Sequence, residues 1–306
     1  MKLVAIVLTF NEEKHIARCL ESIRGVAAEI LVVDSFSADA TCEIARALGA
    51  RVLQRPWVNY AVQFNWALGQ LEEECDWVLR IDADEILSSE LATEMRERLP
   101  AVAVEVAGVS IPRRVTFQGQ MIQHGGVSRL RSVRLFRRGR GRCENRWMDE
   151  HIKVEGKTVD FEGGLLDDNL NTLTWWTEKH NKYASREAVD LLNLEYRFMP
   201  LDSVAQLSGG KTAGLKRWVK EVVYLRMPRG MRAFAYFGYR YVLRLGFLDG
   251  PSGASFHVLQ GFWYRYLVDA KVAEVKRYMK ERKVGAPEAI SKVLAIELAP
   301  SEVSSA

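Results

Sequence analysis

The chain has 306 residues, 48% of them hydrophobic and 27% charged, which is ordinary for a globular protein of one large or two modest domains. The net charge is +4, and the four cysteines are scattered with no C-x-x-C pair, which argues against a zinc site or a disulfide framework and fits a reducing compartment. No run reaches about 18 uninterrupted apolar residues and no signal-peptide pattern opens the chain, so we expect neither a spanning helix nor a secretory leader.

The first hundred residues alternate strand and helix patterns. Apolar runs predict strands over residues 3–8, 30–33 and 77–81, with a shorter one beginning at 52. Helical spacing predicts helices over residues 39–48 and 60–71, one that begins after the expected cap Asn11, and one from Ser88 or Ser89 to about Arg98. This order predicts a parallel, doubly wound α/β sheet.

Polar side chains follow these strands at the point where each one ends. Thr9, Asn11 and Glu12 follow the first strand, Asp34 the second, and Asp82 and Asp84 the fourth. Ligands of open α/β sheets bind beyond the carboxyl ends of the strands. We therefore expect these side chains to converge on one site.

Asp82 and Asp84 carry the clearest chemical signal. Two carboxylates this close repel each other unless a cation compensates, and carboxylate oxygens suit Mg²⁺ or Mn²⁺. Such an ion would in turn hold a diphosphate, which indicates an enzyme that handles a nucleotide-linked group. A lone D-x-D is equally compatible with a solvated acidic turn, and the convergence of the other strand-end residues favours the metal.

The remainder of the chain changes character twice. Residues 101–160 combine short Val-rich runs with Gly-rich turns, which predicts antiparallel additions to the sheet, and from about Leu173 the pattern is helical. Nine arginines and no acidic residue fall between Val106 and Arg142, which favours anionic partners. Residues 216–247 mix aromatic and basic side chains, a composition typical of a membrane-surface element, although a helical subdomain with a solvated face would share it.

Three segments together resemble a known enzyme family: residues 7–13 (VLTFNEE), 32–35 (VVDS) and 77–85 (WVLRIDADE). They are similar to the inverting family 2 glycosyltransferases of the GT-A fold. Residues 133–137 (VRLFR), 179–183 (KHNKY) and 246–250 (GFLDG), with Glu150 before a strand, resemble the branch that contains lipopolysaccharide-core β-glucosyltransferases. The resemblance spans roughly residues 1–280.

The resemblance implies roles for the strand-end residues. Thr9, Asn11 and Glu12 would line the nucleotide pocket, Asp34 would accept a hydrogen bond from the base, and Asp82 would approach the ribose. Asp84, with Asp82 beside it, would hold the Mn²⁺ or Mg²⁺ that bridges the two phosphates. Relatives often carry a cation next to Asn65, in the third helix, but this chain has Gln63-Phe64-Asn65 there. Arg80 or the arginines of residues 129–138 could take its place. We expect Arg131 and Arg134 as the phosphate partners, because an arginine fork matches phosphate oxygens, although an exposed basic strand end would share this pattern.

Inverting transfer also needs a general base for the acceptor hydroxyl. The resemblance puts Glu150 in this role and Asp149 second. The chain departs from the usual His-Glu pair, because Asp149 replaces the histidine and His151 follows, so the choice of carboxylate stays open. Among the other histidines, His15 and His180 are expected to be solvated, and His124 is a further candidate to line the site.

The sequence thus predicts three parts: a GT-A catalytic domain over residues 1–170, a helical acceptor- and membrane-docking region over 171–284, and a peripheral tail over 285–306. The expected function is transfer of a glucose-like hexose from a nucleotide diphosphate sugar, UDP favoured, to a glycolipid such as lipopolysaccharide core or a polyprenyl-linked glycan. The expected location is the cytoplasmic face of a bacterial inner membrane, at an anionic surface. The alternative is a basic nucleic-acid- or membrane-binding protein without transferase activity, although the acidic D-x-D argues against nucleic acid; a phosphohydrolase using Asp82 fits its usual motif poorly.

Overall fold

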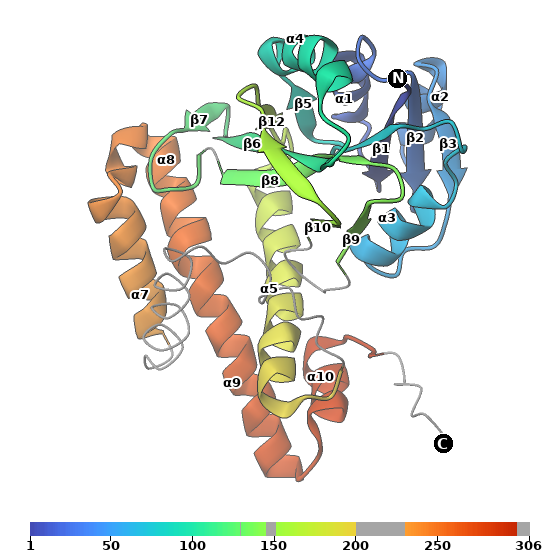
Figure 1. Cartoon of the computed structure of the whole chain (residues 1–306). Helices are drawn as coiled ribbons and strands as arrows, with labels where there is room; N and C mark the ends of the chain where they lie inside the picture. Colours follow the sequence, from blue (N-terminus) through green and yellow to red (C-terminus); the bar gives the residue numbers. More distant parts are fainter. Residues whose placement is uncertain (129, 145–150, 200–229, 299–306) are drawn as a thin grey trace, which may run out of the picture. The chain divides into compact units, whose positions relative to one another are not determined.

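The computed structural model describes residues 1–128, 130–144, 151–199 and 230–298, which form two compact units (Figure 1). The first unit comprises the described residues up to 172 together with 244–254. The second comprises the described residues of 173–243 and 255–298. The structure thus groups residues 244–254 with the strand-rich part of the chain, whereas the division expected at residues 170 and 284 assigned them to the helical region.

A ten-stranded sheet forms the core of the first unit, in the order β3-β2-β1-β4-β8-β6-β12-β5, with β7 and β11 also paired to β6. The first four strands are parallel, and β8 then runs antiparallel to both β4 and β6. The strands are β1 (Leu3–Thr9), β2 (Glu29–Asp34), β3 (Arg51–Gln54), β4 (Trp77–Arg80), β5 (Glu85–Leu87), β6 (Val106–Phe117), β7 (Gln120–Ile122), β8 (Leu130–Arg137), β11 (Lys157–Asp160) and β12 (Leu165–Asp167). A separate pair joins β9 (Gly141–Cys143) to β10 (Ile152–Val154). The mostly parallel sheet with an antiparallel extension is confirmed, although β11 and β12 run parallel to β6.

Alternating side chains explain why β1 reads as a continuous apolar run. Leu3, Ala5 and Val7 enter a core cluster shared with α1 (Ile16–Ile23), α2 (Thr41–Ala47) and α4 (Ser89–Arg98). Val4 and Ile6 point to the opposite face, into a cluster shared with α3 (Tyr60–Leu68). Because successive side chains of a strand alternate in direction, a strand covered on both faces is apolar at every position.

The helix starts agree with the sequence in part. The Ser88 side chain accepts a hydrogen bond from the Leu91 N–H at 3.2 Å and caps α4, as expected. The prediction that Asn11 caps α1 is wrong. Helix α1 begins at Ile16 with no side-chain cap, and Asn11 has a left-handed backbone with a φ of 56°. Its amide instead joins the loop that follows β2, as described below.

The second unit is helical, as expected from Leu173 onward. It contains α5 (Leu173–Tyr196), α7 (Met231–Gly238), the π-helical segments η4 (Tyr239–Leu243) and η6 (His257–Trp263), α9 (Tyr264–Arg282) and α10 (Ala286–Leu294). Ala188 and Leu192 of α5 pack with Val275 of α9 and Ile290 of α10. The segment expected to be a peripheral tail therefore contains a helix with buried residues. Among the described helices, none is long and apolar enough to cross a membrane.

His180, expected to be solvated, is instead half-buried among aromatic side chains of this unit. Its ring stacks on Trp176 with centroids 3.4 Å apart, and burial lowers its pKa to about 4. The prediction of a solvated side chain is therefore wrong. Trp176 and Tyr183 lie one helical turn from His180 on α5, and polar residues are interspersed with them. The sequence pattern of this helix therefore did not distinguish a buried face from a solvated one.

Candidate functional site

The carboxyl ends of β1, β2 and β4 meet at one edge of the sheet, as the parallel order requires. Thr9 and Asp34 are partners across the ends of β1 and β2, and the Thr9 hydroxyl donates to Asp34 Oδ1 at 2.9 Å. Asp82 and Asp84 follow β4 at the same edge. The structure thus brings together the three strand-end groups that the sequence singled out.

Asp34 is enclosed by donors. Its Oδ2 accepts hydrogen bonds from the Ser37 N–H at 2.9 Å and from the Gln54 amide at 3.0 Å, and the residue has no exposed surface. Burial opposes its charge, but the hydrogen bonds from Ser37 and Gln54 outweigh that effect and lower the pKa of Asp34. It is therefore an ionised carboxylate that fixes the loop after β2, and its contact with a nucleotide base stays a prediction.

Two loops are joined beside Asp34. The Asn11 N–H donates to the Ser37 hydroxyl at 2.8 Å, and the Asn11 side-chain oxygen accepts from the Ala38 N–H at 2.9 Å. These bonds explain the left-handed backbone of Asn11. Asn adopts this conformation more readily than most residues, because its short polar side chain can form local hydrogen bonds. Phe10 and Phe36 flank the joined loops with 60% and 55% of their surface exposed. Their exposure next to a strand-end site is a feature that the sequence analysis missed.

Glu12 and His15 form a second link, to the loop after β12. His15 is buried, against the expectation that it is solvated. Its Nε2 accepts the Leu170 N–H at 2.9 Å, so in the neutral ring Nδ1 carries the hydrogen and donates it to Glu12 Oε2, with 2.6 Å between Nδ1 and Oε2. His15 thus fixes the position of the Glu12 carboxylate. The prediction of a solvated His15 is wrong, because its other partner, Leu170, lies 155 residues away in sequence and no local pattern indicates it.

Asp82 is held by a buried cluster of charged and aromatic groups. The Arg80 Nε donates to the Tyr60 hydroxyl at 2.8 Å, and that hydroxyl lies 2.8 Å from Asp82 Oδ1. Arg134 Nη1 donates to Asp82 Oδ2 at 3.2 Å. Burial opposes the charge of Asp82, but Arg134 and Arg80 outweigh it, so the pKa of Asp82 lies below its ordinary value. Asp82 is therefore neutralised by protein cations.

Glu85 completes this cluster. Its Oε1 accepts from Arg134 Nη2 at 2.7 Å, and its Oε2 accepts from the Asp82 N–H at 3.0 Å. Its side chain is 1% exposed, and burial raises the pKa of Glu85 to about 8. The fork of Arg134 thus spans two carboxylates of the same loop, and it positions Asp82. Tyr60 and Glu85 are further residues whose roles the sequence analysis missed. Tyr60 begins α3 and Glu85 begins β5, and neither lies at the carboxyl end of a strand.

Asp84 differs from Asp82 in that no described cation is paired with it. It is half-buried, and its Oδ2 accepts from the Asn169 amide at 3.0 Å. Its backbone oxygen accepts from the Asp168 N–H at 3.0 Å, and Asp168 is paired with Arg18. Within the described ranges, no group of three or more His, Cys, Asp or Glu side chains could hold a metal by itself. One carboxylate beside an amide fits an ion that takes its other ligands from a diphosphate and water, which is the usual binding of Mg²⁺.

The remaining predicted residues lie apart from this cluster or outside the described ranges. Both polar atoms of the Asn65 amide bond the backbone of Cys143, at 2.9 and 2.8 Å, so Asn65 anchors β9. Arg131 donates to the Phe161 oxygen at 2.7 Å and to the Glu162 carboxylate at 2.8 Å. Their roles toward a nucleotide sugar stay predictions. Asp149 and Glu150 lie outside the described residues.

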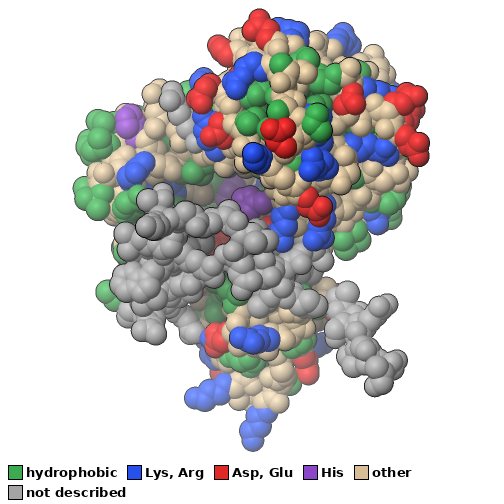
Figure 2. Space-filling view, viewed as in Figure 1, with side chains coloured by type: hydrophobic (Ala, Val, Ile, Leu, Met, Phe, Trp, Pro, Cys, Tyr) green, Lys and Arg blue, Asp and Glu red, His purple; other side chains and the backbone are tan. Residues whose placement is uncertain are grey.

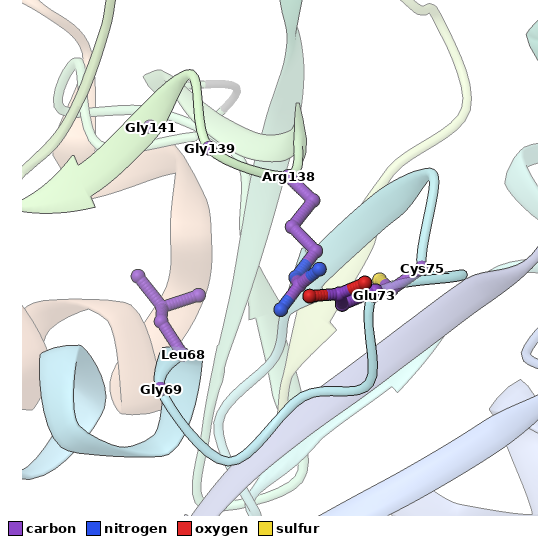
Figure 3. A pocket seen from close by; sticks show the side chains of 7 residues that line it. All are labelled: Leu68, Gly69, Glu73, Cys75, Arg138, Gly139 and Gly141. Carbon is purple, nitrogen blue, oxygen red and sulfur yellow. The ribbon is translucent and has the colours of Figure 1, made fainter.

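A hollow of about 450 Å³ opens on the opposite edge of the sheet (Figure 3). Its lining includes Cys75, which precedes β4, and Arg138, which follows β8. Because β4 begins where β8 ends, this hollow lies at the wrong end of β4 to contain Asp82 or Asp84. The candidate site is therefore defined by its strand ends rather than by this hollow.

Comparison with known proteins identifies the chain. The model of the family "Glycosyl transferase family 2" matches residues 4–152. The chain is 32% identical over 195 residues to the lipopolysaccharide core biosynthesis glycosyltransferase LpsC of Rhizobium meliloti, a match that covers 61% of this chain and 71% of that protein. The chain belongs to glycosyltransferase family 2.

Other relatives agree with this family. An uncharacterized glycosyltransferase of Rickettsia typhi is 45% identical over 96 residues, and this chain spans about a third of its length: the match covers 31% of this chain and 32% of that protein. The mannosyltransferase PcManGT of Pyrobaculum calidifontis, solved in complex with GDP-Man and Mn²⁺, has a TM-score of 0.50 and 13% identity, with 89% of this chain and 87% of that chain covered. This likeness shows the fold. The GT-A architecture predicted from the sequence is therefore confirmed for this family 2 glycosyltransferase.

Proposed function

We propose that this family 2 glycosyltransferase transfers a hexose, glucose-like and carried by UDP, to a membrane-associated glycolipid with inversion at the anomeric carbon. The observation that carries the proposal is the contrast between two carboxylates: Asp82 is paired with the buried Arg134, whereas the Asp84 side chain is hydrogen-bonded to an amide and is paired with no described cation. Asp84 would hold Mn²⁺ or Mg²⁺ together with the diphosphate, and the ion would stabilise the negative charge of the departing nucleotide.

The reaction requires a base on the acceptor side of the donor sugar and a nucleotide-binding pocket on the other side. The acceptor oxygen forms a bond to the anomeric carbon while the bond from that carbon to the diphosphate oxygen breaks. The proton of the acceptor hydroxyl passes to a carboxylate, Glu150 or Asp149. On the nucleotide side, Thr9, Asn11 and Asp34 shape the pocket, and Phe10 or Phe36 offers an exposed ring on which a base can stack.

Calorimetry with UDP, GDP and dTDP, each with and without Mn²⁺, tests the proposal. We expect metal-dependent binding of one nucleotide, UDP, and loss of that binding in Asp84→Asn. Asp76→Asn is the matched control, because Asp76 has a half-exposed side chain and precedes β4 at the opposite edge of the sheet. Absence of nucleotide binding by the wild-type protein, or equal binding by the Asp84 and Asp76 variants, would contradict the proposed donor site.

The acceptor side of the proposal rests on LpsC and on an apolar surface of the second unit. LpsC is named for lipopolysaccharide core biosynthesis. The surface consists of residues with 47% to 74% of their area exposed on α7 and η4: Met231, Phe234, Tyr239, Val242 and Leu243. Contiguous exposed apolar side chains mark sites of interaction, and a membrane surface would cover them.

Cosedimentation with vesicles of phosphatidylethanolamine and phosphatidylglycerol tests this surface. We expect Val242→Glu to weaken vesicle binding about tenfold, because a buried valine contributes at least about 1.5 kcal/mol. Val104→Glu is the control, since Val104 is a more exposed valine of the first unit. Equal binding by the two variants would contradict membrane docking through α7 and η4.

A further inference from the structure

A buried carboxylate orients an exposed imidazole in the first unit. Asp249 is 4% exposed, and its Oδ1 lies 2.7 Å from His124 Nδ1. The same carboxylate accepts the backbone N–H groups of Gln123 at 3.1 Å and of His124 at 3.0 Å. An ionised carboxylate only accepts hydrogen bonds, so His124 Nδ1 donates. In the neutral ring, the lone pair of Nε2 then points away from Asp249.

The imidazole is not needed to close this loop. Hydrogen bonds from two backbone N–H groups already join residues 123 and 124 to the Asp249 carboxylate. In addition, the Gln120 side-chain amide donates to the backbone oxygen of Asp249 at 2.6 Å. The Gly125 N–H donates to the Arg244 oxygen at 2.9 Å. The His124 side chain keeps 36% of its area exposed, and no described residue is hydrogen-bonded to its Nε2. The ring is thus fixed in direction and presents one acceptor atom to the outside.

The strand register places this ring at the edge of the candidate site. Strands β4 and β6 both run antiparallel to β8, so their carboxyl ends share one edge. Val115 of β6 pairs with Asp167 on one side and with Ile122 on the other, so β7 lies on the β8 side of β6. His124 comes two residues after the end of β7, and β8 begins opposite Arg113, two residues from the Val115 that pairs with Ile122. It therefore lies at the edge where Asp82 and Asp84 follow β4.

We infer that His124 binds the acceptor: its Nε2 accepts a hydrogen bond from a sugar hydroxyl of the glycolipid, and Asp249 is the positioning residue that keeps the ring in the required tautomer. This inference rests on the proposed function and extends it to the acceptor subsite. The hydrogen bond orients the acceptor sugar, whereas the proton lost on transfer goes to Glu150 or Asp149. The nucleotide pocket, built on β1 and β2, does not include this ring.

Acceptor kinetics test the inference, with truncated-core lipopolysaccharide as acceptor and saturating UDP-glucose. We expect His124→Ala to raise the KM for lipopolysaccharide about tenfold, the loss of about one hydrogen bond, with the Kd for UDP within twofold of the wild type. His124→Gln should recover part of the loss, because its amide oxygen reaches toward the position of Nε2. Met121→Ala, on the same hairpin and 36% exposed, is the matched control and should leave the KM unchanged.

Nitrogen-15 NMR of the imidazole tests the dyad without turnover. We expect the Nδ1–H tautomer for His124 in the wild type and a mixture of tautomers in Asp249→Asn. An Nε2–H tautomer in the wild type would overturn the inference. So would a KM in His124→Ala equal to that of Met121→Ala, or a parallel loss of UDP affinity and thermal stability, which would show a structural role. A wild-type protein that binds no UDP would instead refute the proposed function, and this inference with it.

Discussion

Removing the Arg134 guanidinium is expected to destabilise the first unit severely. Arg134 has a side chain that is 6% exposed and is paired with Glu85, which is 1% exposed, and with Asp82. In Arg134→Met, the ionised Asp82 loses the cation that does most to lower its pKa, and the buried Glu85 loses its hydrogen-bond donor. Breaking a buried ion pair by removing one partner costs about 3–5 kcal/mol, because an uncompensated charge is left behind. At about 2–4 °C per kcal/mol for a unit of this size, the Tm should fall by roughly 6–20 °C.

Arg131→Met provides the matched control on the same strand. The Arg131 side chain is 30% exposed, and its partner Glu162 is 80% exposed. Exposed ion pairs contribute about 0–1 kcal/mol, so this variant should unfold within about 1 kcal/mol of the wild type. Both free energies come from urea unfolding followed by circular dichroism, with the near-ultraviolet signal of Trp77 and its neighbours as a second probe.

The double variant Arg134→Met/Glu85→Met separates the lost pair from lost packing. Replacing a buried pair by apolar side chains of similar volume is often neutral or stabilising, so the second substitution should recover the part of the lost free energy that belongs to Glu85. The remainder belongs to Asp82, whose pKa is then lowered by Arg80 without Arg134. If Arg134→Met and Arg131→Met differ by less than about 1 kcal/mol, the buried pair does not hold the loop after β4, and the argument that Arg134 positions Asp82 fails.

Two further predictions concern the same unit. Burial raises the pKa of Glu85 from 4.5 to about 8, so the folded state retains a proton that the unfolded chain releases, and stability falls as the pH rises through this interval. Glu85→Gln should flatten that slope in urea titrations, and an unchanged slope would show that Glu85 does not titrate there. Phe36→Ala should raise the Kd for UDP about tenfold, since stacking of a base on an aromatic ring contributes about 1–3 kcal/mol. Tyr196→Ala, an exposed aromatic of the second unit, is the control, and equal affinities would exclude base stacking on Phe36.

The parallel part of the fold was predictable because its signals are local. Apolar runs and helical spacing located β1, β2, β4 and α4, and topology alone brought Thr9, Asp34 and Asp82 to one edge. The direction of β11 and β12 was not predictable in this way. A strand of three or four residues can pair in either direction. Their partner β6 is twelve residues long, so β11 and β12 can both pair with it at different positions.

The supporting residues of the site escaped prediction for a different reason. Tyr60, Glu85 and His15 act through partners that are distant in sequence or hidden within a loop, so no periodic pattern marks them. Asn11 was a reasonable helix cap by residue type, but its amide has a stronger use in joining two loops. Local preference was overridden there by tertiary hydrogen bonds, which is the usual cause of a wrong boundary.

Several arginines of the basic segment between Val106 and Arg142 form hydrogen bonds within the first unit. Its arginines favoured an anionic partner when only their number was known. In the structure, Arg137 donates to the backbone oxygens of Val106 and Val102, Arg138 to that of Leu71, and Arg140 to that of Val104. On the face of the first unit seen in Figure 2, basic and acidic side chains are interspersed rather than gathered by sign.

This use of arginine bears on the alternative of a nucleic-acid-binding protein. Binding to nucleic acid draws its free energy from cations that neutralise phosphates at the surface. Arg134 lies buried between two carboxylates, and Arg137, Arg138 and Arg140 donate to backbone carbonyl oxygens of the first unit. A guanidinium has five N–H donors, so it could in principle bond a backbone carbonyl and a phosphate together. Here the carbonyls and carboxylates of the fold determine where each guanidinium lies. The arginines of β8 and the turn after it therefore support the sheet that carries Asp82 and Asp84, and a phosphate-binding role is best sought at the strand ends.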